Sequence, residues 1–222
     1  MNDLQREARR GLIREMLLEE GGPTRIKLCG MMRTQDMDAV NEALPDMVGF
    51  ITDIPGSRRS LSSGEVGRLA ALADEHVCTV SVSVNLPFSR VGYNARRYVD
   101  LVQLHGDEDE LYIRGVRTRT NAGIIQAFQV HGKEDVERAN RSSADMVLLD
   151  AGQGSGEQFD WGLLEGIRRP YILAGGLTPQ NVAEAVRELR PWGVDLSSGL
   201  ETNGAKDPDK IKAAVAAVRS AL

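Results

Sequence analysis

The sequence contains little that could support a disulfide framework or a metal site. Among its 222 residues only Cys29 and Cys78 are cysteines, which is too few for a network of bridges. His76 and His131 have no acidic or cysteine companions at the spacing of metal ligands. We therefore predict neither a metal nor a cofactor.

The chain also lacks an excess of positive charge. Its formal net charge is -5 and no stretch concentrates lysine and arginine, so we predict no nucleic-acid or anionic-membrane partner. No apolar run is long enough to cross a bilayer, and residues 1–20 lack the uninterrupted apolar core of a signal peptide. These features predict a cytoplasmic protein whose partner is a small molecule.

From residue 25 onward, short apolar runs alternate with longer stretches of helical period. Eight runs are predicted to be strands and start about every 24 residues, at 25–29, 47–51, 78–84, 101–104, 124–128, 146–149, 171–173 and 193–196. This spacing fits one strand, one helix and two short loops, repeated eight times. We predict the α/β class and a single (β/α)8 TIM barrel over residues 25–222.

Helix signals support this count. The patterns predict helices over 36–43 and 62–72 and, more weakly, around 111–116. Thr178 and Pro179 are predicted to cap the helix after the seventh strand, with the threonine as N-cap and the proline in the first turn. Asp207 and Pro208 repeat this pair before a last helix at 211–218.

Residues 1–24 form a separate N-terminal extension. One side of a predicted amphipathic helix carries Leu4, Ala8, Leu12, Ile13, Met16 and Leu17, and glycines at 21 and 22 followed by a proline end it. The helix is expected to lie on the barrel or to fray in solvent, because isolated helices of this length are marginal. Self-association through this helix is the alternative, so the oligomeric state stays open between monomer and homodimer.

Alternation along the strands predicts which side chains face the barrel interior. On the first strand, Cys29 shares a face with Lys27 and Arg25, whereas Ile26 and Leu28 face the helices. The same rule pairs Gln103 with His105, Leu148 with Asp150, and Asp195 with Ser197. Because polar groups at inward positions are costly unless they are satisfied or useful, these residues predict one polar mouth at the carboxyl ends of the strands.

Six blocks of sequence at these strand ends carry a family pattern. They lie at 27–30, 57–59, 103–106, 150, 175–177 and 195–201. In this order and spacing they resemble phosphoribosylanthranilate isomerase, the barrel enzyme of tryptophan biosynthesis, from residue 26 to the last helix. Residues 152–156 and Phe159, Asp160 and Trp161 are also similar to the family.

The resemblance implies an Amadori rearrangement, the third step from chorismate in tryptophan biosynthesis. N-(5-phosphoribosyl)anthranilate would be opened and converted to 1-(2-carboxyphenylamino)-1-deoxyribulose 5-phosphate, which needs one general acid and one general base. By similarity Asp150 is the acid and Cys29 the base. Asp150 must hold a proton, which burial favours. Cys29 must be partly thiolate, and Lys27 is the candidate cation for this unless Asp195 neutralises it.

The resemblance also implies binding residues. Arg59 matches the arginine that meets the anthranilate carboxylate, and a guanidinium suits such a planar partner. The remaining substrate contacts would be Lys27, Gln103, His105 and Asp195, with His105 alternatively a loop residue bonded to Asp107. Glycines and a serine after the last two strands would bind phosphate through backbone N–H groups, unless they only make turns; they are Gly175, Gly176, Ser198 and Gly199.

The chain departs from the family pattern near the expected aromatic-ring site. Thr52 and Ser83 stand in segments where relatives carry further apolar or aromatic residues, which leaves the contacts to anthranilate open. The residues disfavour three other functions. A sugar isomerase of histidine biosynthesis is disfavoured because Cys29 and Phe128 stand where that enzyme has carboxylates. Indole-glycerol-phosphate synthase is disfavoured because its lysine and glutamate groups are absent from these positions. A non-enzymatic binding module is disfavoured because it would need neither Cys29 nor Asp150.

Overall fold

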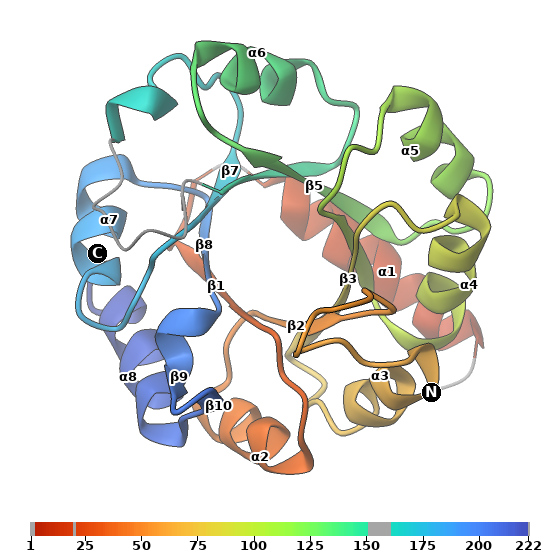
Figure 1. The fold of residues 1–222 in the computed structure, drawn as a ribbon, viewed down its shortest axis with the longest axis horizontal. Coiled ribbons are helices and arrows are strands. Elements are labelled where there is room, and N and C mark those ends of the chain that lie inside the picture. Colours follow the sequence, from red (N-terminus) through yellow and green to blue (C-terminus); the bar gives the residue numbers. More distant parts are fainter. Residues whose placement is uncertain (1–2, 20, 151–160, 222) are drawn as a thin grey trace.

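The computed structural model describes residues 3–19, 21–150 and 161–221 and shows a closed barrel of eight parallel strands (Figure 1). The strands are β1 (Arg25–Cys29), β2 (Met47–Ile51), β3 (Cys78–Ser83), β4 (Leu101–Leu104), β5 (Gly123–Gln129), β6 (Met146–Asp150), β7 (Tyr171–Ala174) and β8 (Gly193–Leu196). All eight predicted strands are present, with ends that differ by at most one residue. The predicted barrel is confirmed.

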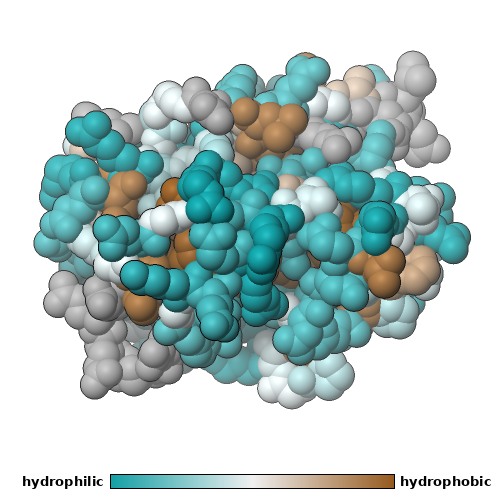
Figure 2. All heavy atoms as spheres, turned by 90° about the horizontal axis from the view of Figure 1, so that it is seen from above, coloured by the Kyte–Doolittle hydropathy of each residue, from teal (hydrophilic) through white to brown (hydrophobic). Residues whose placement is uncertain are grey.

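Helices surround the barrel on its outside. They are α2 (Thr34–Ala43), α3 (Ser63–Ala70), α4 (Phe88–Tyr98), α5 (Glu110–Arg117), α6 (Lys133–Arg141), α7 (Val182–Leu189) and α8 (Pro208–Arg219), with the 3-10 helices η1 (Trp161–Leu164) and η2 (Ser198–Leu200). Between η2 and α8 a small antiparallel hairpin pairs β9 (Glu201–Thr202) with β10 (Ala205–Lys206). On the face shown in Figure 2, hydrophobic residues form only small separate patches among hydrophilic ones.

The two faces of each strand build two different cores. Ile26 and Leu28 point outward and are fully buried under the helices. Inward residues nearer the amino ends of the strands form a second apolar cluster at the floor of the barrel, which includes Met47, Cys78 and Ile125. Cys78 therefore lies at the rim opposite to Cys29, as predicted from its place at the start of a strand.

Several local predictions need correction. Thr178 does not cap α7, because the helix begins at Val182 with Asn181 as N-cap, and Thr178 lies in the preceding turn. After β6 the described residues contain the short η1 where the repeat predicted a full helix. The pair before the last helix is confirmed, since the Asp207 side chain accepts hydrogen bonds from the first turn of α8.

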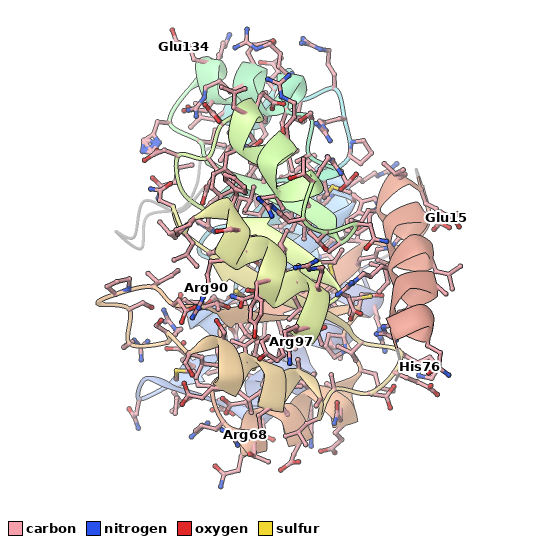
Figure 3. All side chains as sticks on the ribbon, turned by 90° about the vertical axis from the view of Figure 1, so that its right-hand side faces the viewer. Glu15, Arg68, His76, Arg90, Arg97 and Glu134 are labelled. Atoms are coloured by element: carbon pink, nitrogen blue, oxygen red, sulfur yellow. The ribbon has the colours of Figure 1, made fainter. Side chains whose placement is uncertain are left out.

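The N-terminal helix α1 (Asp3–Leu18) lies across the amino-terminal end of the barrel (Figures 1 and 3). Ile13 and Leu17 join the floor cluster, and Leu17 is 1% exposed. The predicted apolar face is partly wrong, because Leu12 is 68% exposed and Ala8 also faces solvent. The helix is rotated so that Arg10, not Leu12, is buried.

Two arginines hold α1 on the barrel. The Arg10 side chain is buried and donates to the main-chain carbonyls of Ala95 and Val99 at the carboxyl end of α4. The Arg9 guanidinium donates to Asp100 with its Nε at 3.0 Å. Cations at a helix carboxyl end satisfy carbonyls that have no partner within the helix. These contacts explain why a charged surface of α1 faces inward.

Replacing Leu17 by alanine is expected to destabilise the fold by about 2–3 kcal/mol, because it leaves a cavity in the floor cluster. Its Cδ1 would lie only 2.9 Å from a Cβ at Gly123, so glycine at that position makes room for it. The free energy of unfolding in urea measures the loss. Leu18→Ala is the matched control, because Leu18 is 60% exposed. Equal losses in the two variants would show that α1 is not docked on the floor.

Candidate functional site

The carboxyl ends of the strands surround a cavity of about 370 Å³. Eight of the residues predicted for the site line it: Cys29, Gln103, His105, Asp150, Gly175, Gly176, Asp195 and Ser198. Cys29 ends β1 and Asp150 ends β6, and two strands, β7 and β8, separate them around the barrel on one side. The thiol and the carboxyl therefore face one chamber from different walls.

Cys29 sits at the bottom of this chamber against β2. A Cβ at Gly49 would lie 3.0 Å from the Cys29 Sγ and 3.2 Å from the Lys27 Nζ. Any larger residue at position 49 would therefore displace both groups. Gly49 gives the thiol and the ammonium room to lie side by side.

Lys27 is fully buried and forms an ion pair with Asp195 on the neighbouring strand β8, with 2.7 Å between Nζ and Oδ2. Burial disfavours the ammonium, but the charges of Asp195 and Cys29 outweigh it and raise the pKa of Lys27. Lys27 thus stays charged, and the sequence-based expectation that Asp195 pairs with it agrees with this geometry.

The environment of Cys29 contains opposing influences. Burial raises the pKa of the thiol, Lys27 lowers it, Asp195 raises it again and Lys206 lowers it, and the net direction is upward. Lys27 alone therefore does not bring the pKa of the thiol below its usual value, because burial and the charge of Asp195 oppose it.

His105 lies in the cavity and not in a solvent-facing loop. Its Nδ1 is 2.9 Å from the Gln103 side-chain nitrogen, and its Nε2 is 3.6 Å from Oδ2 of Asp150. The alternative of a bond from His105 to Asp107 is wrong, because the two ring nitrogens face Gln103 and Asp150. His105 connects the Gln103 amide to the carboxyl that ends β6.

Two buried acceptor atoms at the site have no hydrogen-bond partner among the described residues. They are Oε1 of Gln103 and Oδ1 of Asp195, and both side chains line the cavity. A buried acceptor without a donor is costly, so these two atoms suit a ligand that brings hydroxyl or N–H donors. A sugar has donors of this kind.

Arg59 lies beside the cavity lining and not in it. Its Nε donates to Oε1 of Glu201 at 2.6 Å, and Arg58 contacts the other carboxylate oxygen of Glu201. These two cations hold the pKa of Glu201 at about 2, although burial opposes this. The two terminal nitrogens of Arg59 have no protein partner among the described residues and remain available for a carboxylate.

Lys206 is a functional candidate that the sequence analysis missed. It lies in β10, its side chain is fully buried, and its Nζ is 3.3 Å from Oε1 of Glu201. Burial lowers its pKa, and the charges of Cys29 and Glu201 oppose this. The sequence offered one signal for Lys206, which is its position in a segment of glycine and charged residues just after residue 201, where the family pattern ends.

The turns after β7 and β8 require glycine. Gly175 and Gly176 have φ values of 100° and 63°, which favour glycine. A Cβ at Gly199 would lie 2.1 Å from the carbonyl oxygen of Leu177, so the two turns touch. Gly199 itself is not part of the cavity lining, and its role is to let η2 approach the β7 turn.

Aliphatic side chains form the cavity wall contributed by β2 and β3 and the residues that follow them. Ile51, Ile54, Val82 and Val84 line the cavity there. Thr52 is fully buried and shares a 2.8 Å hydrogen bond with the Ser81 hydroxyl. Branched aliphatic residues therefore make this wall apolar, without a Phe, Tyr or Trp among the described residues that line the cavity.

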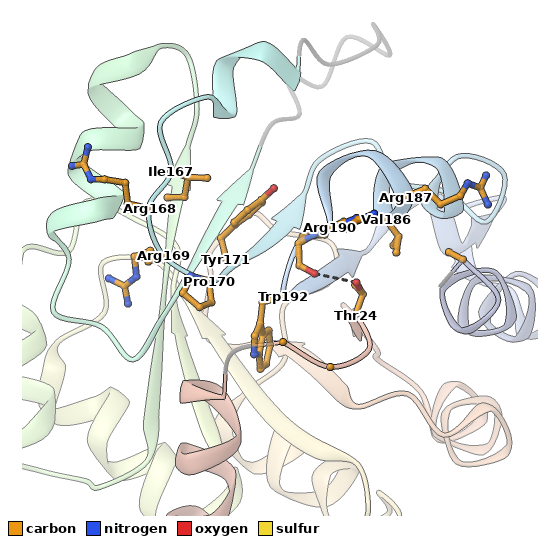
Figure 4. Close-up of a pocket in the computed structure, with 14 residues that line it drawn as sticks. Thr24, Ile167, Arg168, Arg169, Pro170, Tyr171, Val186, Arg187, Arg190 and Trp192 are labelled. Atoms are coloured by element: carbon orange, nitrogen blue, oxygen red, sulfur yellow. Dashed lines mark hydrogen bonds between the residues drawn. The ribbon is translucent and has the colours of Figure 1, made fainter.

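A second cavity of about 890 Å³ lies at the opposite end of the barrel, beside Thr24 and Trp192 (Figure 4). None of the predicted site residues lines it. The Arg168 guanidinium pairs with Glu137, and Arg169 donates to main-chain carbonyls. The side chains of Arg168, Arg169 and Arg187 point away from one another, so they do not converge on one ligand.

Three further features concern the extent of the described residues, metal sites and membrane spans. Residues 152–156 and Phe159 and Asp160, which resemble the family, lie outside the described residues, and Trp161 begins η1. The described residues hold no group of three histidine, cysteine or acidic side chains that could bind a metal ion. In the same part of the chain, no helix has both the length and the apolar character that a membrane span needs.

Comparison with known proteins gives a consistent result. Residues 26–217 match the family model of N-(5'-phosphoribosyl)anthranilate isomerase. The curated enzyme of that name from Endomicrobium trichonymphae is 41% identical over 202 residues, covering 88% of this chain and 98% of the relative. In these matches about a tenth of this chain has no counterpart, whereas the relatives are covered almost completely.

Solved structures agree with the sequence match. An isomerase of the same name, in complex with reduced 1-(o-carboxyphenylamino)-1-deoxyribulose 5-phosphate, aligns with a TM-score of 0.76 at 33% identity and covers 88% of this chain and 98% of its own. Monomers derived from the dimeric isomerase of Thermotoga maritima align with a TM-score of 0.77 at 32% identity, covering 89% and 99%.

Proposed function

Because this chain belongs to the N-(5'-phosphoribosyl)anthranilate isomerase family of tryptophan biosynthesis, we propose that Cys29 is the base and Asp150 the acid of its rearrangement. The observation that supports this most is that both groups line one cavity at the carboxyl ends of β1 and β6. A chamber of about 370 Å³ lies in the range of small-ligand sites. The two groups then reach one sugar from different sides.

The proposed reaction has two proton transfers. The Asp150 carboxyl gives its proton to the ring oxygen of the ribose while the nitrogen lone pair breaks the bond between that oxygen and C1, which leaves an open-chain iminium. The Cys29 thiolate then removes the proton from C2, and the electron pair neutralises the iminium nitrogen to give an enolamine. Tautomerisation of the enol to the ketone completes the aminoketose, so the enzyme needs no cofactor.

Ribose hydroxyls are the proposed donors for the two acceptors that have no protein partner. A hydroxyl near β8 donates to Oδ1 of Asp195, and one near β4 donates to Oε1 of Gln103. Lys27 donates to the other oxygen of Asp195 and so orients the carboxylate. His105 contacts the substrate between Gln103 and Asp150.

The carboxylate and the phosphate of the substrate are assigned to different parts of the site. Arg59 uses Nε for Glu201 and offers its terminal nitrogens to the planar anthranilate carboxylate. Backbone N–H groups in the turns after β7 and β8 bind the phosphate, with Gly175, Gly176, Ser198 and Gly199 forming them. The aliphatic wall covers the aromatic ring.

Gly199→Ala is expected to raise KM about tenfold, because the added methyl group would push η2 away from Leu177 and disturb charge-assisted hydrogen bonds to phosphate. Steady-state kinetics of the variant measure this effect. Gly64→Ala is the matched control, because a Cβ at Gly64 meets open space in helix α3. An unchanged KM for Gly199→Ala would remove the η2 turn from the phosphate site.

Loss of anthranilate fluorescence on adding the enzyme to phosphoribosylanthranilate is the assay for these assignments. They require Cys29→Ala and Asp150→Asn to be folded and nearly inactive. Turnover of the aminoimidazole sugar of histidine biosynthesis, without turnover of phosphoribosylanthranilate, would contradict the substrate assignment. A reducing, cytoplasmic location and a monomer or homodimer are proposed, the former because a catalytic thiol must stay reduced.

A further inference from the structure

We propose that Lys206 is a positioning residue for this reaction, whose ammonium stabilises the Cys29 thiolate from the side of β10. The proposal rests on the assignment of Cys29 as the base. It adds a cation that lies outside the cavity lining and acts through the thiol. Lys206 does not itself meet the substrate.

The hairpin after β8 brings Lys206 against the turn that follows Cys29. Its Nζ donates to the carbonyl oxygen of Ser197 at 2.8 Å, and the Ser197 hydroxyl donates to the carbonyl oxygen of Cys29 at 3.3 Å. A Cβ at Gly30, the residue after Cys29, would lie 3.6 Å from the Lys206 Nζ. The ammonium and the end of β1 are therefore close neighbours.

The local charge balance distinguishes Lys206 from Lys27. Lys27 lowers the pKa of the Cys29 thiol, but Asp195, 2.7 Å from its Nζ, raises that pKa and offsets part of the effect. Lys206 instead shares the single carboxylate of Glu201 with Arg58 and Arg59. Three cations share one carboxylate, so the groups on this side of Cys29 carry a net positive charge.

The charged and titratable groups around Cys29 come from every neighbouring element. They are Lys27 on β1, Asp195 on β8, Glu201 on β9, Lys206 on β10 and Arg59 in the loop after β2, with His105 and Asp150 across the cavity. Burial raises the pKa of Cys29, and Lys27 and Lys206 are the cations that lower it. Removing the charge of Lys206 raises the pKa of the thiol further, so less thiolate is present at any pH below that value.

The experiment is alkylation of the intact enzyme by iodoacetamide, measured against pH and assigned to each cysteine by mass spectrometry. Only the thiolate reacts, so the rate reports the ionised fraction without depending on turnover. Lys206→Met and Lys206→Gln both remove the charge, and the glutamine keeps a donor for Ser197. At pH 7.5 both variants are expected to slow alkylation of Cys29 about tenfold.

Two comparisons control for other effects of the substitution. Cys78, in the floor cluster, must react at the same rate in all variants. Lys212→Met removes a lysine that pairs with Glu42 on the outer surface and must leave the rate at Cys29 unchanged. Circular dichroism shows whether the Lys206 variants are folded, and Lys206→Gln, which keeps a donor for Ser197, is the deciding variant.

The outcomes separate this proposal from the assignment of the base. An unchanged rate of Cys29 alkylation in both Lys206 variants would overturn the proposal for Lys206. Slow alkylation in the methionine variant with a normal rate in the glutamine variant would also overturn it, because the hydrogen bond to Ser197 would then matter and the charge would not. If Cys29→Ala retained turnover while both Lys206 variants slowed alkylation, the base assignment would fail and the charge coupling would stand.

Discussion

Cys29→Ala is expected to lower kcat by about a thousandfold or more, with KM changed far less, because the variant cannot remove the proton from C2 of the iminium. The side chain is buried at the end of β1 and lines the cavity, so its loss leaves the phosphate turns and Arg59 in place. Loss of anthranilate fluorescence measures turnover. A Cys29→Ser variant should be nearly as inactive, since a hydroxyl is far less acidic than a thiol.

Cys78→Ala is the matched control for this result. It removes the chain's second cysteine, which is also buried but lies at the floor of the barrel. Burial raises the pKa of Cys78 to about 12, so this thiol is not a base near neutrality. The control variant is expected to keep its activity. Turnover by Cys29→Ala within tenfold of the wild type would remove Cys29 from the chemistry.

The strands and the site were predictable because each depends on a short segment. Alternation within β1 alone places Lys27 and Cys29 on the inward face. The parallel barrel then brings Cys29 and Asp150 to one rim, since strand ends with the same direction share an edge. Residues separated by more than a hundred positions line one cavity for this reason, without any pairwise signal in the sequence.

Features that depend on packing between segments could not be predicted in the same way. Helical period gives α1 an apolar stripe, but the docked face is chosen by Arg10, which finds carbonyls at the end of α4. Leu12 is exposed as a result. Lys206 follows the last block of the family pattern within a few residues. Its ammonium lies near the end of β1 only because β9 and β10 form a hairpin.

Thr178 shows a different limit. A threonine followed by a proline is a common helix start, and the same pair also favours a turn. Here the Asn181 side chain accepts from the Thr178 N–H, which makes the turn the better-satisfied choice and delays α7 to Val182. The delay lengthens the segment between the β7 glycines and the helix.

Asp150→Asn is expected to lower kcat by a similar factor, about a thousandfold, because an amide keeps the shape of the carboxyl and has no proton to give to the ring oxygen. The neighbouring hydrogen bonds hold this carboxyl in place. The Gln103 amide N–H donates to His105 Nδ1 across 2.9 Å, so the ring N–H lies on Nε2 and points toward Oδ2 of Asp150, 3.6 Å away. Oε1 of Gln103 stays open for a ribose hydroxyl.

This arrangement gives Asp150→Asn a second readout and a control. The asparagine carbonyl oxygen can still face the N–H of His105 Nε2, so KM is expected to stay within a fewfold of the wild type while kcat falls. Asp107→Asn neutralises an exposed carboxylate in the loop after His105 and is expected to leave both constants unchanged. A near-normal kcat for Asp150→Asn would mean that water protonates the leaving ring oxygen. The carboxyl at the end of β6 would then only orient the sugar, and Cys29 would be the sole protein group that moves a proton.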